Sequence, residues 1–210
     1  MRQKMKQLMG ILLSLVMVLG LVPGMSLTAY AATETYTNLM DNKTVVKFNN
    51  HDWYIIADDS TATGGTVTLL AADTSFGTSV FDSTSPYSNA YSSSTVKGVL
   101  DALIAEGGAF ASVKDAIADT DLNDVGVTGA KLYLLSTSEA EPYVNFNFTG
   151  AQYGGWWLRS QGYGDYDAAF VYGGSGDVNG NGLNVGYTIG VRPALTLSAS
   201  AKMFLIQMRR

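Results

Sequence analysis

Gly155-Trp-Trp-Leu-Arg-Ser160 and Gly190-Val-Arg-Pro-Ala-Leu195 are the two stretches of the sequence that decide its fold. Each begins with a glycine, continues with aromatic or branched residues that favour strands, and contains one arginine. An arginine between Gly, Trp and Val is expected to be partly buried, with its N–H donors bound to loop carbonyls or a carboxylate. We therefore interpret Arg159 and Arg192 as braces for the surrounding loops, and an anionic ligand held by Arg159 is the alternative.

The two adjacent tryptophans are expected to point to opposite faces of one strand. Trp156 is interpreted as a structural core residue, and Trp157 as a residue that faces a loop layer or solvent. The sequence around them is rich in glycine, since 12 of the 23 glycines fall between Gly150 and Gly190. This composition predicts short strands at 156–159, 168–172 and 183–189 separated by long loops, where binding groups often lie.

Tyrosine together with Gly, Ser and Asn is a composition typical of recognition loops, because rigid aromatic rings give contact area at low entropy cost. Packing of a small β core is an equally good interpretation of the same rings. The candidate ligand-binding residues are Trp157, Arg159, Tyr163, Asp165, Tyr166 and Tyr172.

Elsewhere the pattern predicts a mixture of strands and helices. Alternating or β-branched residues predict strands at 44–48, 52–57, 66–71, 131–135 and 191–197. Apolar residues at helical spacing predict a helix over 96–104, capped by Ser93 or Ser94 and ended by Gly107-Gly108, and a shorter helix over 112–118. Ser136/Glu139 and Ser138/Glu141 both have capping-box spacing, so Glu139 is interpreted as structural.

The N-terminus has the three parts of a secretory signal: basic residues, the apolar run 8–22, and Ala29-Tyr-Ala31 as a cleavage site. The apolar run is shorter than the roughly 20 residues that span a bilayer. We expect a signal at 1–31, a linker at 32–43, one domain at 44–198 and a tail at 199–210. Removal of the signal leaves 10 basic and 18 acidic residues, a net charge of −8. The expected location is therefore extracellular or at the cell surface.

Composition excludes several kinds of chemistry. The chain has no Cys and one His, so it has no disulfides, no thiolate nucleophile and no pair of imidazoles for a metal. Its acidity argues against nucleic-acid binding. His51 is interpreted as an exposed turn residue, and the acidic pairs Asp58/Asp59 and Asp165/Asp167 as solvated surface, with carboxylate-dependent hydrolysis as the alternative.

One segment resembles the first half of a calcium loop. Asp177, Asn179 and Asn181 have the required spacing and precede Gly182, but Thr188 stands where the twelfth-position acid is expected. A hairpin turn is the preferred interpretation, because Asn-Gly pairs supply positive φ. No cofactor is expected, with calcium as the weaker possibility.

Gly155–Ser160, Gly190–Leu195 and Leu134-Leu-Ser-Thr-Ser-Glu139 together resemble a family of exported bacterial domains of unknown function that is common in gut clostridia. The same segments resemble, more distantly, the C-type-lectin-like fold of formylglycine-generating enzymes and of variable receptor proteins. This resemblance implies an α+β domain with short antiparallel strands, two or three helices and long Gly-rich loops. Gln161 stands where the family usually has Pro.

These observations predict a non-catalytic binding module. It is expected to contact an extracellular glycan or protein through the loops of residues 150–190, with no nucleic-acid partner and no membrane span after the signal. A ligand-free spacer domain of a surface protein and a carboxylate-dependent hydrolase on the same fold are the two alternatives.

Overall fold

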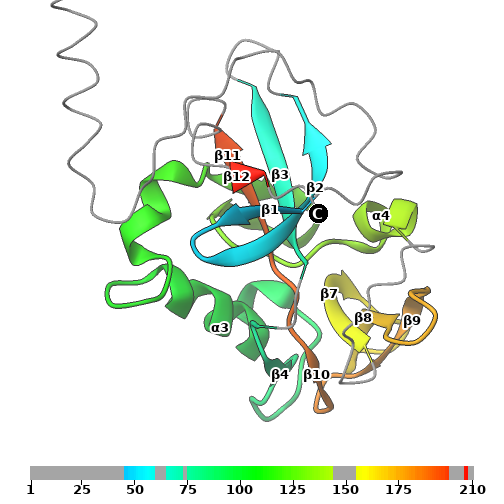
Figure 1. Ribbon diagram of the computed structural model, residues 1–210. Coiled ribbons are helices and arrows are strands. Elements are labelled where there is room, and N and C mark those ends of the chain that lie inside the picture. The colour runs from blue at the N-terminus through cyan, green and yellow to red at the C-terminus, as the bar shows by residue number, and fades with distance from the viewer. Residues whose placement is uncertain (1–44, 60–64, 73–74, 144–154, 199–205, 208–210) are drawn as a thin grey trace, which may run out of the picture. The chain divides into compact units, whose positions relative to one another are not determined.

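The computed structural model describes residues 45–59, 65–72, 75–143, 155–198 and 206–207. The expected signal and linker lie outside these residues, as does most of the expected tail. The described chain is a mixed α+β structure built mainly from antiparallel strands (Figure 1). All of it lies in one compact unit.

Sheet A joins the beginning of the described chain to its end, in the order β11-β3-β2-β1-β12 with every pair antiparallel. β1 and β2 form a hairpin whose two turn residues, Asn49 and Asn50, both have positive φ, as a tight two-residue turn requires. Its strands are β1 (Val45–Phe48), β2 (His51–Asp58), β3 (Thr66–Ala71), β11 (Ala194–Ser198) and β12 (Ile206–Gln207).

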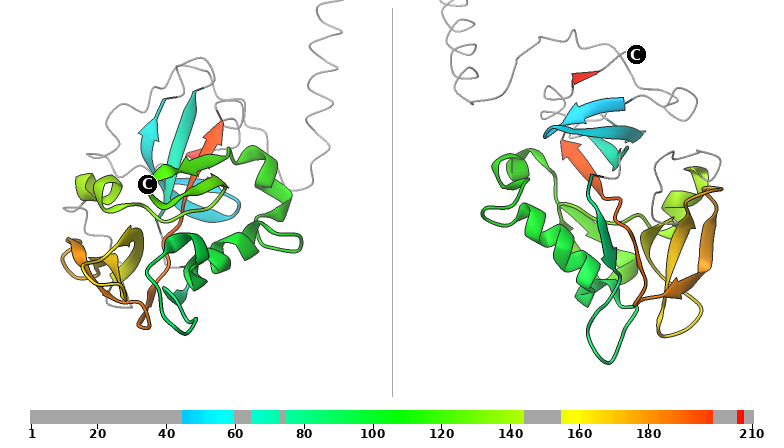
Figure 2. Two further views of the ribbon diagram at one scale, coloured as in Figure 1. Left: turned by 180° about the vertical axis from the view of Figure 1, so that it is seen from behind. Right: turned by 60° about the horizontal axis from the view of Figure 1, so that its bottom comes forward.

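Sheet B has the order β4-β10-β7-β8-β9 and lies apart from sheet A in both views of Figure 2. Its neighbours are antiparallel except for β10 and β7, which run parallel with Gly190 opposite Trp156. Its strands are β4 (Thr78–Val80), β7 (Gly155–Gln161), β8 (Asp167–Tyr172), β9 (Val178–Asn184) and β10 (Thr188–Gly190).

The helices connect these sheets. α3 (Thr95–Ile104) begins at Ser94, whose side chain accepts a hydrogen bond from the Lys97 N–H, and buries Val96 and Leu100. α4 (Thr137–Ala140) is a single capped turn. The remaining elements are the 3-10 turns η2 (Tyr91–Ser93), η3 (Ala111–Ala116), η4 (Asn123–Val125) and η5 (Glu141–Tyr143), and the hairpin of β5 (Thr120–Leu122) and β6 (Val127–Ala130).

Several predicted elements differ from the observed ones. α3 ends at Ile104, before Gly107, and the second predicted helix is the 3-10 turn η3. Residues 131–135 form no strand, because Tyr133 bridges singly to Ala194 of β11 while the Leu135 carbonyl accepts from Arg159 of β7. The segment therefore spans the two sheets and belongs to neither. The stretch predicted as one strand at 183–189 is divided between β9 and β10.

Both tryptophans of β7 are buried, which corrects the expectation that one would face a loop layer or solvent. Trp157 is fully buried, and its indole N–H donates to the Ser79 carbonyl at 2.9 Å. Trp156 is also buried, on the opposite side of the strand. β7 lies between β10 and β8 in the middle of sheet B, and its first five residues are buried on both faces.

The glycine that begins β7 is required for the close approach of β8. Gly155 has a φ of +150°, and a Cβ there would overlap the Val171 carbonyl oxygen. We expect Gly155→Ala to lower the free energy of unfolding by about 3 kcal/mol or more, from backbone strain and overlap together, measured by urea denaturation.

Gly180→Ala is the matched control, because a Cβ at Gly180 of β9 meets nothing within 4 Å. We expect it to change stability by about 0.5 kcal/mol or less. Equal losses in the two variants would contradict the steric explanation.

Candidate functional site

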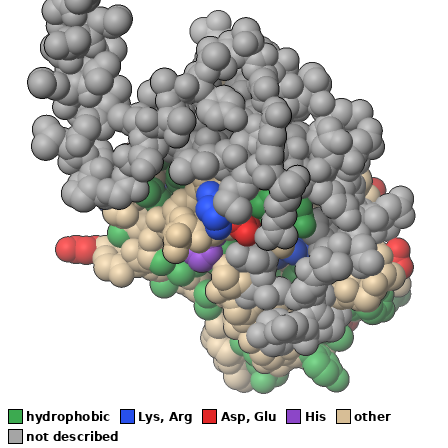
Figure 3. All heavy atoms as spheres, viewed as in Figure 1, with side chains coloured by type: hydrophobic (Ala, Val, Ile, Leu, Met, Phe, Trp, Pro, Cys, Tyr) green, Lys and Arg blue, Asp and Glu red, His purple; other side chains and the backbone are tan. Residues whose placement is uncertain are grey.

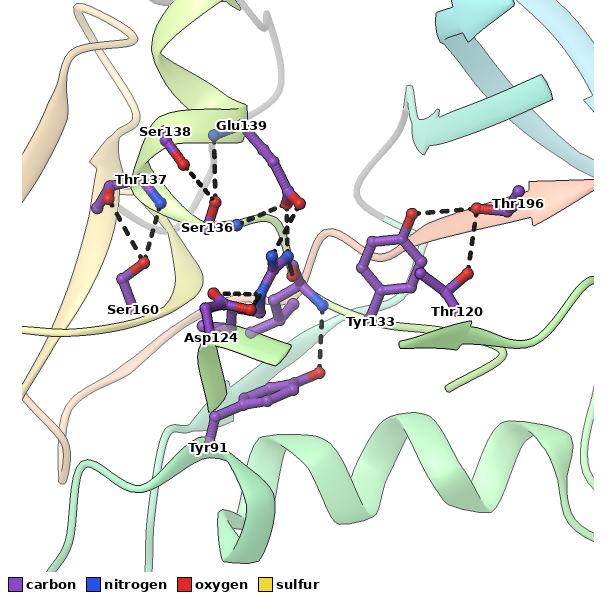
Figure 4. Close-up of polar contacts among 12 residues, drawn as sticks. Tyr91, Thr120, Asp124, Tyr133, Ser136, Thr137, Ser138, Glu139, Ser160 and Thr196 are labelled. Atoms are coloured by element: carbon purple, nitrogen blue, oxygen red, sulfur yellow. Dashed lines mark hydrogen bonds and ion pairs between the residues drawn. The ribbon is translucent and has the colours of Figure 1, made fainter. Parts of the chain in front are cut away.

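Arg159, which is buried, lies at the centre of a polar cluster and bonds the carboxylates of Asp124 from η4 and Glu139 from α4, both of which are labelled in Figure 4 and have side chains that are 43% exposed. The Arg159 side chain is 5% exposed and uses all three guanidinium nitrogens. Nε donates to both carboxylate oxygens of Asp124 at 2.9 and 3.1 Å, and Nη2 donates to Glu139 Oε1 at 2.8 Å. Nη1 donates to the other Glu139 oxygen and, at 2.9 Å, to the Leu134 carbonyl. Every nitrogen of the guanidinium is therefore occupied.

The electrostatics of this cluster favour a permanently charged arginine. Burial lowers the pKa of the Arg159 guanidinium, but the hydrogen bonds and opposite charges of Glu139 and Asp124 outweigh burial and hold that pKa above its usual value. A buried cation is tolerated when its partners are in place and costs several kcal/mol when one is removed. In the structure the guanidinium of Arg159 is bonded to these two carboxylates, as the brace interpretation expects.

Glu139 reaches Arg159 because a capping box fixes its side chain. The Glu139 N–H donates to Ser136 Oγ, and the Ser136 N–H donates to Glu139 Oε2 at 2.9 Å. The alternative pair Ser138/Glu141 forms no box, since Ser138 Oγ bonds Ser136 Oγ instead. The same turn is tied to β7 a second time, because the Thr137 N–H donates to Ser160 Oγ at 3.0 Å.

The Leu134 peptide is held from two sides. Its N–H donates to the Tyr91 hydroxyl at 3.2 Å, and its carbonyl accepts from Arg159. The neighbouring Tyr133 hydroxyl bonds Thr196 Oγ1 of β11 at 3.2 Å, as Figure 4 also shows. Burial raises the pKa values of both the Tyr91 and the Tyr133 phenols. The cluster thus connects sheet B, the segment before α4, η2 and sheet A.

The second arginine, Arg192, is also a brace. Its guanidinium carbon lies 5.5 Å from the ring centre of Trp156, and Nη2 donates to the Ala72 carbonyl at 3.2 Å. A Cβ at Gly190 would approach the Gly155 carbonyl to 2.9 Å, so the two motif glycines lie against each other. The three motif segments of the sequence therefore converge on one part of the molecule.

A second feature lies just beyond Gln161, the last residue of β7, on three neighbouring loops. Four tyrosines are exposed there, and we name them the tyrosine surface: Tyr87 (47% exposed), Tyr163 (93%), Tyr166 (52%) and Tyr187 (60%). Tyr87 packs over Gly186, where a Cβ would lie 3.9 Å from the Tyr87 Cζ atom. The described part of Figure 3 shows side chains of the hydrophobic class projecting at the lower edge, where Figure 1 places the loops beside β4 and β10.

Asn89, which is buried, holds these loops together. Its side-chain amide donates to the carbonyls of Gly164 and Asp167 at 2.8 and 3.1 Å, and its N–H donates to the Asp165 carbonyl. Its side-chain oxygen accepts from Gln161 Nε2 at 3.1 Å. Gln161 therefore helps to position Asn89 and the loops that Asn89 bonds.

The remaining ligand-binding candidates of the sequence do not all lie on the tyrosine surface. Tyr172 is 46% exposed but lies at the far end of β8, where it packs on Phe170 and accepts from Asn179. Asp165 is exposed beside Tyr166. Trp157 is buried, so a surface ligand does not reach it. Asn89, Tyr87 and Asp124 could not be identified from the sequence, because their roles depend on partners more than 30 residues away.

The calcium-like residues lie along the β8–β9 hairpin. The turn occupies residues 173–177, and Asn179 and Asn181 lie within β9. The Asn179 amide is engaged at both atoms, since it donates to Tyr172 and accepts from the Gly182 N–H. Across the described ranges, no group of three or more His, Cys, Asp or Glu side chains could hold a metal ion.

His51 is the first residue of β2 and not a turn residue. Its ring stacks on Phe76 and Phe110, at centroid distances of 4.6 and 5.5 Å, and its Nδ1 bonds Ser75 Oγ at 2.8 Å. The exposed-turn interpretation of His51 is therefore wrong, because the two-residue hairpin turn ends at Asn50. In the described part of the chain no helix is long and apolar enough to cross a membrane.

These features define an α+β domain braced internally by arginine, with an exposed tyrosine surface. Residues 110–199 match the model of a domain of unknown function (DUF6273). That range contains Arg159 and both of its carboxylate partners, but not Tyr87 or Asn89. Neither a search of curated proteins nor a search of solved structures finds a match.

The Arg159 cluster predicts a large loss of stability when the cation is removed. Arg159→Met leaves Asp124, Glu139 and the Leu134 carbonyl without their donor, and because both carboxylates are 43% exposed we expect a loss of about 2–3 kcal/mol in urea denaturation. Arg159→Lys recovers less than half, because one ammonium cannot replace the planar fork. The control Lys97→Met breaks the exposed pair with Asp101 and is expected to cost about 0.5 kcal/mol. If Arg159→Met lost only about 0.5 kcal/mol of unfolding free energy, the interpretation of Arg159 as a brace would be wrong.

Tyr91 predicts a loss of stability at alkaline pH. Its pKa is raised by burial, so the folded state keeps the phenol proton while the unfolded chain releases it near pH 10. This contribution is complete below about pH 10 and declines as the pH rises toward the pKa of the folded state. In Tyr91→Phe, stability falls by about 1 kcal/mol at neutral pH, but the decline above pH 10 is shallower. Unfolding free energies at pH 8–12 measure this, and an unchanged slope beside a Tyr172→Phe control would contradict it.

Proposed function

We propose that this chain is an exported, non-catalytic binding module that contacts an extracellular glycan or protein through the tyrosine surface, without a cofactor. The observation that carries the proposal is the exposure of four tyrosines on three neighbouring loops. Elsewhere in the described chain Tyr172 is exposed on its own, whereas Trp53, Phe81 and Trp157 are buried. Exposed aromatic groups gathered in one place are typical of interaction sites.

The composition of these loops supports recognition. Residues 82–90, 162–166 and 184–187 consist mainly of Ser, Gly, Asn and Tyr, together with Asp82 and Asp165. Tyr rings offer a large apolar face and a hydroxyl, which suits both the faces of sugar rings and protein surfaces. No Lys or Arg occurs in the three loops, which argues against a phosphate-rich partner such as nucleic acid.

The loops are also held in place before any partner arrives. Asn89 bonds the loop at 162–166, and the Val185 N–H donates to the Tyr166 carbonyl at 2.9 Å. The Phe81 N–H donates to the Val185 carbonyl at 2.9 Å and joins the third loop. Preorganised loops lose little entropy on binding, so a modest surface can bind usefully.

A C-type-lectin-like fold is the finer architecture that we propose for the domain. The resemblance implies a strand, a capped helix start, an Arg-Ser segment and a terminal Gly-x-Arg strand in that order. The bonds of Arg159 to Glu139 and of Thr137 to Ser160 support this reading, since they join the capped turn to the Arg-Ser segment.

The tyrosine surface predicts which substitutions abolish binding. The probes are a neutral-glycan array and an array of extracellular protein domains. We expect Tyr163→Ala and Tyr187→Ala to weaken the wild-type signal at least about tenfold with little change in unfolding free energy, because these rings are exposed. EDTA is expected to leave the signal unchanged.

Tyr172→Ala is the control, since it removes a tyrosine that is 46% exposed but lies at the far end of β8. Its binding should equal that of the wild type. Two blank arrays would favour the spacer alternative, and equal losses in all three variants would show that the tyrosine surface is not the contact.

A further inference from the structure

A pocket of about 390 Å³ opens beside the Arg159 cluster. It is lined by residues from η2, η4 and the end of β7: Ala90, Tyr91, Ser92, Asp124, Val125, Ser160 and Gln161. This volume is at the lower end of the range for small-molecule sites, which suits a ligand of about one ring. None of the functions discussed so far uses this pocket.

The polar side chains of the pocket are one carboxylate, one amide and three hydroxyls. Asp124 contributes the carboxylate, each oxygen of which receives one bond from Arg159 Nε and keeps a second acceptor position. Gln161 donates through Nε2 to Asn89, and no described residue donates to its side-chain oxygen. Tyr91, Ser92 and Ser160 add hydroxyls that can both donate and accept. A ligand with several hydroxyl groups, which also donate and accept, complements this set.

The charges of the pocket exclude anionic ligands. No Lys or Arg lines it, and the neighbouring Arg159 already uses all of its nitrogens on Asp124, Glu139 and Leu134. The Asp124 charge is also balanced by Arg159, which weakens its attraction for a cation. A neutral ligand bearing several hydroxyl groups fits this arrangement best, because hydroxyls donate strongly to a carboxylate.

The pocket adjoins the tyrosine surface. Gln161 lines the pocket and bonds Asn89, and Asn89 bonds the carbonyl of Gly164, which lies between Tyr163 and Tyr166. Ala90, the residue after Asn89, also lines the pocket. A single oligosaccharide can therefore extend from the tyrosine surface into the pocket.

We propose that this pocket binds one neutral sugar residue of a glycan whose neighbouring residues lie on the tyrosine surface. The proposal rests on the proposed function, since it names a glycan as the partner of that surface. Asp124 and Gln161 accept hydrogen bonds from the sugar hydroxyls, and Ala90 and Val125 contribute apolar lining. Asp124 is here a binding residue as well as a partner of Arg159.

The test fills the pocket from a residue without a structural role. Ser92→Phe places a ring at a lining position, whereas Ser93→Phe places the same ring on the next residue, which does not line the pocket. Both serines are exposed, so both variants are expected to fold, which thermal denaturation confirms. The probes are the neutral-glycan array and, by saturation-transfer NMR, glucose, galactose, mannose and N-acetylglucosamine.

The expected result is at least about a tenfold loss of glycan signal in Ser92→Phe with wild-type signal in Ser93→Phe. Asp124→Asn keeps an oxygen near Arg159 and is expected to weaken binding by a smaller factor. Glycan binding that depends on Tyr163 but survives in Ser92→Phe would overturn the pocket and leave the proposed function standing. Binding of protein domains alone, or of choline or inorganic phosphate in place of the sugars, would also overturn it.

Discussion

The hydrogen bonds between the Arg159 guanidinium and the carboxylates of Asp124 and Glu139 are the interaction on which the rest of the structure depends. A guanidinium that is 5% exposed has lost nearly all of its hydration. That loss is offset only when both carboxylates and the Leu134 carbonyl are in place together. β7, η4 and the turn at α4 are therefore expected to assemble as one cooperative unit rather than one after another.

β7 has a buried part that stabilises the fold and an exposed end that positions the neighbouring loops. The first five residues of β7 are buried and carry Trp157 and Arg159, while Gln161 at its end is exposed and bonds Asn89. The buried part of β7, in which the nitrogens of Arg159 are all hydrogen-bonded, thus ends two residues before the loop that carries exposed tyrosines. Such a division allows the exposed side chains to change without disturbing the brace, because the loops are fixed largely through backbone carbonyls.

Local features of the fold could be predicted from the sequence, and features set by distant partners could not. The strand at 66–71, the Ser94 cap of α3 and the Ser136/Glu139 box follow from neighbouring residues and were predicted. The segment at 131–135 has strand composition, yet its partners lie in two different sheets. For the site, Tyr163 and Tyr166 were found by composition. Tyr87 and Asn89 were not, since they join the surface from more than 70 residues away.

The order of sheet A has a mechanical consequence. The described chain begins in sheet A with β1 and ends in it with β11 and then β12; β2 and β3 lie between β1 and β11, and β12 pairs with β1. Tension between residues 45 and 198 therefore loads the ladders of sheet A first. Sheet B and its loops lie outside that direct path and carry little of the load. A domain with this layout can keep the loops of the tyrosine surface in shape while sheet A is under tension.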